Sequence, residues 1–171
     1  MRALALLLLA STAHADPLLI SASARRACIP AGGDHGEWEG VGLALEPSAR
    51  ARTSLRLYAG IDELTNHSDS ATYAYAGYQL TALAGVRVVL AGGPNARLFY
   101  AAAVGGGYMR TANPGEPMSA SERLYVEPVR FGVEYDVDDN LALRVEAAVD
   151  LHWTSYDPIA VIGAGGVAVR L

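Results

Sequence analysis

The sequence predicts an all-β protein, an antiparallel up-and-down barrel of eight strands that crosses a membrane. Residues 141–153 alternate apolar and polar side chains over thirteen positions, a period of two that no helix produces. Residues 124–137 repeat this pattern, and the Asp and Asn residues at 138–140 suit a tight hairpin turn between the two segments. Similar segments recur along the chain as far as Leu171. Together they predict a closed sheet built from hairpins.

The eight strands are expected to follow one another through short connections. The residue pattern places them at 38–45, 54–62, 71–80, 86–91, 98–109, 124–137, 141–153 and 159–171. The connections at 46–53, 81–85, 111–121 and 154–158 then face the outside of the cell, and the turn at 138–140 faces the periplasm. An even number of strands returns both ends of the sheet to one side, and closure leaves no unpaired edge in lipid.

The apolar face of the strands is predicted to contact lipid and the polar face to line the interior. The polar face carries charges of both signs, and the chain has no Lys, a residue common on soluble exteriors. Tyr125 and Tyr135 lie ten residues apart, which at about 3.3 Å per residue and a tilt of about 45° spans roughly 23 Å of the barrel axis. The apolar band of an outer-membrane barrel is about 25 Å tall and edged by aromatic girdles. The predicted girdle consists of Tyr100, Tyr108, Tyr125, Tyr135 and Trp153. A soluble periplasmic calyx is the alternative.

The N-terminus predicts export. Met1 and Arg2 precede an apolar run rich in Leu, and Ala13, His14 and Ala15 form a cleavage site before Asp16, which together describe a signal peptide at 1–15. We expect 16–36 to be a periplasmic lead-in, in which 18–23 is a candidate short strand, and 37–171 to be the barrel. The only cysteine, Cys28, excludes an internal disulfide.

At this level the chain resembles the small eight-stranded outer-membrane barrels of the OmpA and OmpX type. The resemblance covers roughly 37–171 and is one of pattern, without a diagnostic motif. The last strand is similar to the C-terminal strand by which the barrel assembly machinery recognises such proteins, although it ends in Leu171 where that family usually has an aromatic residue. The resemblance implies the outer membrane of a Gram-negative bacterium, with outer-membrane lipid or lipopolysaccharide and the assembly machinery as partners.

The inward charges form the first candidate site. A charge alone in a narrow lumen is costly, so opposite signs are expected to pair there. The predicted network consists of Arg56, Arg87, Arg130, Glu134, Arg144, Glu146, Asp150 and Arg170, and it also includes Asp62. Such a network would plug a pore too narrow to conduct, whereas the alternative interpretation is a small selective channel.

The second candidate site is catalytic. Asp150 and His152 share the inward face near the outer rim, and Ser155 begins the connection that follows. An acyl hydrolase or acyltransferase acting on lipid A would need a Ser hydroxyl within reach of an imidazole that a carboxylate orients. The sequence spacing does not establish that geometry, so the leading expectation is that the protein is not an enzyme.

The leading prediction for function is therefore a porin-like barrel at the cell surface with a structural or surface-interaction role. Thirteen Arg against eighteen Asp and Glu give a net charge of −5, which argues against nucleic acid as a partner. No cofactor and no metal site are expected. The alternatives are the lipid A-modifying enzyme and the small pore.

Overall fold

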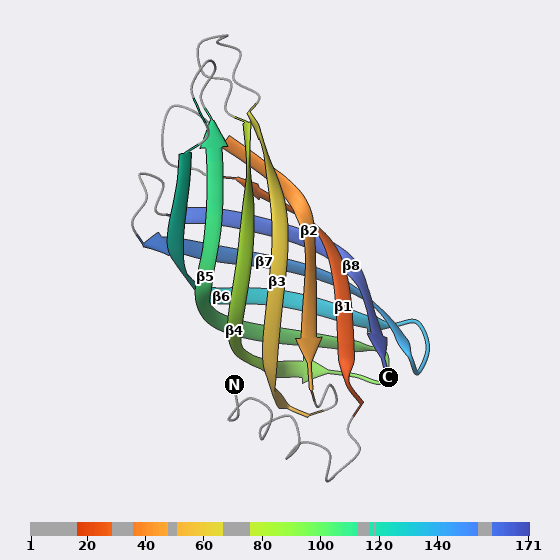
Figure 1. Cartoon of the computed structure of the whole chain (residues 1–171). Helices are drawn as coiled ribbons and strands as arrows, with labels where there is room; N and C mark the ends of the chain where they lie inside the picture. The colour runs from red at the N-terminus through yellow and green to blue at the C-terminus, as the bar shows by residue number, and fades with distance from the viewer. Residues whose placement is uncertain are drawn as a thin grey trace.

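The chain forms a closed antiparallel barrel of eight strands in consecutive order, β1 to β8, with β1 paired to β8 (Figure 1). The computed structural model describes residues 17–28, 36–47, 51–66, 76–112, 117, 119–153 and 159–171. The strands are β1 (Leu19–Cys28), β2 (Gly36–Glu46), β3 (Thr53–Asn66), β4 (Ala76–Gly92), β5 (Ala96–Ala112), β6 (Ser119–Asp136), β7 (Leu141–Trp153) and β8 (Ile159–Arg170). The predicted fold class is therefore confirmed.

The predicted lead-in at 16–36 is wrong, because Leu19–Cys28 is the first strand of the barrel. Its small and polar residues, with only weak alternation, hid it in the sequence. In the structure it closes the sheet by pairing with β2 on one side and β8 on the other. The barrel thus begins about eighteen residues earlier than predicted, at Leu19 rather than at residue 37.

The described part of the predicted strand at 71–80, residues 76–80, and the predicted strand at 86–91 belong to one strand, β4, so the predicted loop at 81–85 does not exist. Residues 71–75 lie outside the described part of the structure. Gly85 lies within the predicted loop, and in the structure it makes a close contact between strands. A Cβ at Gly85 would lie 2.0 Å from the carbonyl oxygen of Ala102 on β5. The glycine therefore marks a place where neighbouring backbones approach each other.

The prediction omits β1 and divides β4 in two, so the number of strands is still eight. The end of the barrel at which some connections lie is nevertheless reversed. The connection at 47–52 joins β2 to β3 at the barrel end that holds the C-terminus, and not at the opposite end with the connection after β5. The turns at 93–95 and 137–140 also lie at the C-terminal end. There Asp138 accepts hydrogen bonds from the backbone N–H groups of Asn140 and Leu141, at 2.7 and 2.8 Å, which stabilises the predicted tight turn.

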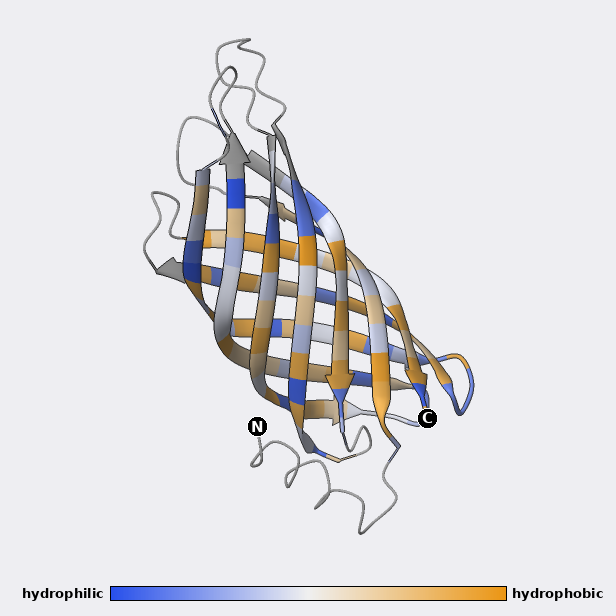
Figure 2. Cartoon of the chain, in the orientation of Figure 1, coloured by the Kyte–Doolittle hydropathy of each residue, from blue (hydrophilic) through white to orange (hydrophobic). Residues whose placement is uncertain are grey.

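Hydropathy alternates along the strands, as Figure 2 shows, and the two faces differ sharply. Buried polar and charged side chains point inward, whereas many large aliphatic and aromatic side chains are exposed on the outside. Val145 on β7 is 66% exposed, and Leu43 on β2 is 59% exposed. Within the described residues, no helix is long and apolar enough to cross a membrane.

An irregularity in β6 corrects one residue of the predicted aromatic girdle. The register between β6 and β7 shifts between Val126 and Val129, around Pro128. Proline cannot donate a ladder hydrogen bond, so a bulge forms there and the alternation of faces changes phase. Tyr125 is therefore buried inside the barrel, while Tyr135, on the other side of the bulge, is 51% exposed on the outside.

The other girdle residues that the structure describes lie on the outer surface. Tyr135 lies near the C-terminal end of the barrel, and Tyr108 lies toward the opposite end. Tyr100 is half-buried against Phe131, with ring centroids 5.6 Å apart and an interplanar angle of 60°. The side chain of Trp153 lies outside the described part of the structure.

Candidate functional site

The barrel interior is the candidate site, because the inward faces of the strands bury many charged side chains there. Among the described residues, six arginines and six carboxylates are buried. The arginines are Arg25, Arg56, Arg87, Arg130, Arg144 and Arg170, and the carboxylates are Glu46, Asp62, Glu127, Glu134, Glu146 and Asp150. The buried charges balance, so the interior as described needs no counterion.

Glu134 on β6 is the centre of the network near the C-terminal end. It is the cross-strand neighbour of Arg97 on β5 and of Arg144 on β7. Its carboxylate accepts hydrogen bonds from Arg97 at 2.7 Å, Arg144 at 2.5 Å and Arg170 at 2.9 Å. Arg87, from β4, adds an ion pair at 3.6 Å. Four strands are therefore joined through one fully buried carboxylate.

Two more glutamates extend the network across the lumen. Glu46 on β2 accepts a hydrogen bond from Arg144 at 2.6 Å and lies 3.4 Å from Arg87. Glu146 on β7 binds both terminal nitrogens of Arg56, each at 2.9 Å, and also accepts from Arg130 at 2.5 Å. These bidentate, charge-assisted contacts are the strong class of hydrogen bond. They connect strands that lie far apart in the sequence.

An aromatic ring lies beneath the arginines of this network. Phe99 on β5 is fully buried, and the guanidinium carbons of Arg87 and Arg144 lie 4.7 and 5.0 Å from its ring centroid. Its cross-strand neighbour is Gly132. A Cβ at Gly132 would lie 2.2 Å from the ring, so only glycine leaves room for it there. The ring stabilises two cations that few water molecules could reach.

A smaller cluster lies farther from the C-terminal end. Arg25 on β1 forms an ion pair with Asp62 on β3 at 2.8 Å and donates a hydrogen bond to the Tyr58 hydroxyl. The Tyr58 ring also contacts Arg130, whose guanidinium carbon is 5.5 Å from the centroid. On β6, Arg130 binds both oxygens of Glu127, at 2.7 and 2.5 Å. This cluster links β1 and β3 to the bulged part of β6.

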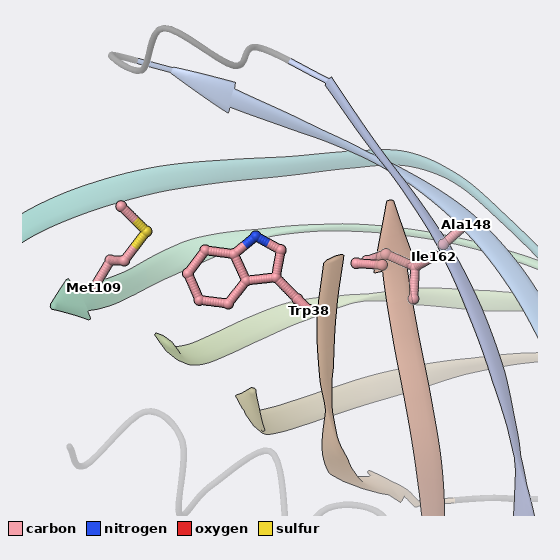
Figure 3. Close-up of a cluster of buried hydrophobic side chains, with 5 residues drawn as sticks. Trp38, Met109, Ala148 and Ile162 are labelled. Carbon is pink, nitrogen blue, oxygen red and sulfur yellow. The ribbon is translucent and has the colours of Figure 1, made fainter. Parts of the chain in front are cut away.

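Apolar side chains cover this smaller cluster toward the end of the barrel. Trp38, Met109 and Ile162 come from β2, β5 and β8 and are buried together with Ala27 and Ala148 (Figure 3). At the C-terminal end, Leu19, Ala142 and Ala168 form a second apolar cluster. The apolar cover is incomplete at the C-terminal end, because Arg97, Asp136 and Arg170 line a pocket there.

The structure brings together the residues predicted for the lumen network. Arg56, Arg87, Arg130, Glu134, Arg144, Glu146 and Arg170 all take part in the ion pairs described above, and Asp150 is buried in the same lumen. Asp150 lies in contact with the Glu127 carboxyl group. Of the three catalytic candidates it is the one the structure describes. The side chains of His152 and Ser155 lie outside the described residues, so the triad stays a prediction.

Several residues of the interior were missed in the sequence. Arg25 falls in the predicted lead-in and Glu46 in a predicted connection, because β1 shows only weak alternation and β2 extends one residue beyond its predicted end. Glu127 was hidden by the bulge. A proline inside an alternating segment is a signal for such a bulge. Applied at Pro128, it would have placed Tyr125, Glu127 and Arg130 on the same face.

No protein-family model matches the chain, and no curated protein matches it in sequence. Solved structures do match in fold. Neisserial surface protein A has a TM-score of 0.63 at 15% identity and covers 91% of this chain and 96% of its own. Ail, the attachment invasion locus protein of Yersinia pestis, has a TM-score of 0.59 at 10% identity, covering 91% and 97%. The N-terminal barrel of OprF from Pseudomonas aeruginosa has a TM-score of 0.56 at 13% identity, covering 91% and 98%. The chain therefore has the fold of the eight-stranded outer-membrane barrels.

Proposed function

We propose that this protein is an outer-membrane barrel of a Gram-negative bacterium with a structural or surface-interaction role. The observation that carries the proposal is the contrast between a buried, charge-balanced interior and an exposed apolar exterior on the same strands. In water the apolar face of a sheet would be the buried one. Such an arrangement is stable where apolar molecules contact the outer face of the barrel, and we propose that these molecules are membrane lipids.

The dimensions support a membrane span. A spanning strand needs about 9–11 residues at a tilt of about 45°. The shortest strand, β1, has 10 residues and β6 has 18, so every strand is long enough. The long strands β4 to β6 would extend beyond the hydrocarbon region. Two fold neighbours are named an attachment invasion locus protein and a surface protein, which accords with a surface role.

The connections support one orientation. Those at the C-terminal end, 47–52, 93–95 and 137–140, are short, and outer-membrane barrels have short periplasmic turns. We therefore assign the C-terminal end to the periplasm. The opposite end, where β1, β3, β5 and β7 finish, would then face outward.

The interior supports a structural plug over a small pore. Ion pairs with bidentate geometry fill it, and the Trp38, Met109 and Ile162 cluster covers it toward the outward end. A pore interpretation requires conductance in planar bilayers. We expect the folded protein to give none.

Gel mobility before and after boiling, combined with cell fractionation, tests the membrane assignment. Closed barrels often stay folded in cold detergent because every backbone group is paired within the sheet. We expect a mobility shift and recovery in the outer-membrane fraction. Release by osmotic shock with no shift would mean a soluble calyx, and the proposal would be abandoned.

A charge placed on the outer face gives a sharper test. Val145 lies in the middle of β7 and is 66% exposed. In lipid vesicles, Val145→Arg should lower the free energy of unfolding by about 2–4 kcal/mol, because the barrel exterior at mid-depth is hydrocarbon. The matched control is Val137→Arg, beside a turn and 53% exposed, where a cost of about 0–1 kcal/mol is expected. Equal, small losses in the free energy of unfolding for the two variants would indicate that water surrounds both positions.

The lipid A-modifying enzyme is the second candidate, carried by the sequence spacing of Asp150, His152 and Ser155. It requires a change in lipid A mass that Ser155→Ala or His152→Ala abolishes. We expect lipid A of the same mass with and without the gene.

A further inference from the structure

Asp150 on β7 lies opposite the bulge of β6. The register between the two strands shifts there, so two residues of β6, Glu127 and Pro128, face the single residue Asp150. Such a bulge interrupts the ladder of backbone hydrogen bonds between strands. The side chains of Asp150 and Glu127 are joined by a hydrogen bond, and they are only 1% and 2% exposed. A buried side-chain contact therefore connects β6 and β7 at the place where their ladder is interrupted.

A hydrogen bond between two carboxyl groups requires a proton on one of them, because a carboxylate can only accept. Arg130 identifies the ionised member of this pair. Its Nε and Nη2 atoms donate to the two oxygens of Glu127 at 2.7 and 2.5 Å. This fork geometry is the one in which a guanidinium group binds a carboxylate. Glu127 is therefore the carboxylate of the pair.

The surroundings of Asp150 suit a neutral side chain. Its Oδ1 atom is buried and has no hydrogen-bond partner among the described residues. A buried charge is costly unless it is paired and hydrogen-bonded. The two arginines of the smaller cluster already pair with other carboxylates, Arg25 with Asp62 at 2.8 Å and Arg130 with Glu127. Two cations and two carboxylates thus balance in this cluster when Asp150 is uncharged.

The groups around Asp150 come from several strands. Strand β8 places Ala160 opposite it, and on β7 itself the side chain of His152 lies outside the described residues. The charged and titratable side chains of β1, β3 and β6 that surround it are Arg25, Asp62, Tyr125, Glu127 and Arg130. The nearest of these is the Glu127 carboxylate, and a like charge beside it opposes ionisation of Asp150.

We infer that Asp150 is a protonated carboxylic acid that donates to Glu127 and joins β6 to β7 at the bulge. Removal of this proton leaves two adjacent carboxylates in the bulge, so the contact is sensitive to pH. The interior stays balanced, because Asp136 pairs with Arg170 at the C-terminal end and is 20% exposed. The inference goes beyond the proposed function and concerns only the interior, so it holds whether lipid or water surrounds the barrel.

Infrared spectroscopy of the folded protein at neutral pH, in a detergent without ester groups, tests for this proton. A protonated carboxyl group has a C=O stretching band separate from those of carboxylates, and carboxyl groups exposed to water are ionised at this pH. We expect the parent chain to show the band and Asp150→Asn to lose it. Asp136→Asn, which removes an ionised carboxylate, is the control and should keep the band. A parent chain without the band, or a band that persists in Asp150→Asn, would overturn the inference.

The pH dependence of urea unfolding gives a second test. The folded chain holds a proton that Asp150 releases to water on unfolding, so the stability should fall as the pH rises. The folding equilibrium constant should decrease by up to about tenfold per pH unit from mildly acidic to neutral pH, the limit for one proton. Asp150→Asn should remove this slope, because its amide N–H donates to Glu127 at every pH.

His152→Gln is the matched control for the slope, because an imidazole also titrates near neutral pH. This variant should keep the slope that Asp150→Asn removes. A slope lost in His152→Gln and kept in Asp150→Asn would assign the proton to the imidazole and overturn the inference. A parent chain whose stability does not fall as the pH rises would overturn it too. If Asp150→Asn fails to fold, the band of the parent chain and the slope in His152→Gln still decide the question.

Discussion

Two neighbouring residues of β5 show how differently the two faces of this sheet are built. Phe99 points inward, beside Gly132, and lies under the guanidinium groups of Arg87 and Arg144. Tyr100 points outward, beside Phe131, and donates a hydrogen bond to the carbonyl oxygen of Pro128 at 2.5 Å. The inner face is thus held together by charges around an aromatic ring. On the largely apolar outer face, the Tyr100 hydroxyl is bonded to the backbone of the bulge.

The outer face of this barrel supplies its hydrophobic pattern, whereas the inner face supplies the contacts that stabilise it. Exposed aliphatic side chains on the outside define the environment in which the sheet is stable. Contacts between walls of the barrel come from the inside, where Glu134 alone joins arginines of β4, β5, β7 and β8. Substitutions on the two faces should therefore fail for different reasons.

The largest effect is expected from Glu134→Gln. Four arginines would then face one another around a neutral amide, and a buried charge without its partner costs about 3–5 kcal/mol. Urea unfolding in lipid vesicles, followed by fluorescence, measures the loss. The control is Asp136→Asn on the same strand, which is 20% exposed and should cost less. A loss below about 1 kcal/mol in Glu134→Gln would show that water or another carboxylate replaces it.

The next effect is expected from Gly132→Val. The new Cβ would displace the Phe99 ring, and overpacking of this kind costs about 1–3 kcal/mol. The matched control is Gly163→Val on the outer face, where an added Cβ meets nothing within 4 Å and the change should be near zero. The same unfolding measurement serves both. Equal losses for the two glycines would remove the distinction between a packed interior and an open exterior.

Much of this architecture could be predicted from the sequence, because alternation fixes the face of each residue wherever the strand is regular. It placed Arg144 and Glu146 inside and Leu143 and Val145 outside correctly. It failed where the backbone departs from regularity, as at Pro128, whose bulge reversed the faces on its N-terminal side. It also failed at Leu19–Cys28, where Ser and Ala give little contrast. Which arginine meets which glutamate depends on register across several strands, and no local pattern encodes that.

A comparable effect, specific to the outer face, is expected from Tyr100→Phe. The Pro128 carbonyl would lose its hydrogen bond, and in lipid no water replaces it, so we expect a loss of about 1–3 kcal/mol. Phe keeps the ring contact with Phe131, which isolates the hydroxyl. Tyr108→Phe, at an exposed outer position, is the control and should change stability little. If Tyr100→Phe is as silent as its control, the outside of the bulge is hydrated.

The smallest effect is expected at the periplasmic turn, where the same kind of bond is exposed to water. Asp138 accepts from the N–H groups of Asn140 and Leu141. Asp138→Ala removes both bonds, but water can solvate the two donors, so the net loss should be about 0.5–1.5 kcal/mol despite the larger number of bonds. Asp139→Ala, whose side chain is also exposed in this turn, is the control. The free-energy loss per hydrogen bond at Asp138 and at Tyr100 compares a bond in water with a bond in lipid. A larger loss per bond at Tyr100 supports lipid on the outer face, and a larger loss per bond at Asp138 contradicts it.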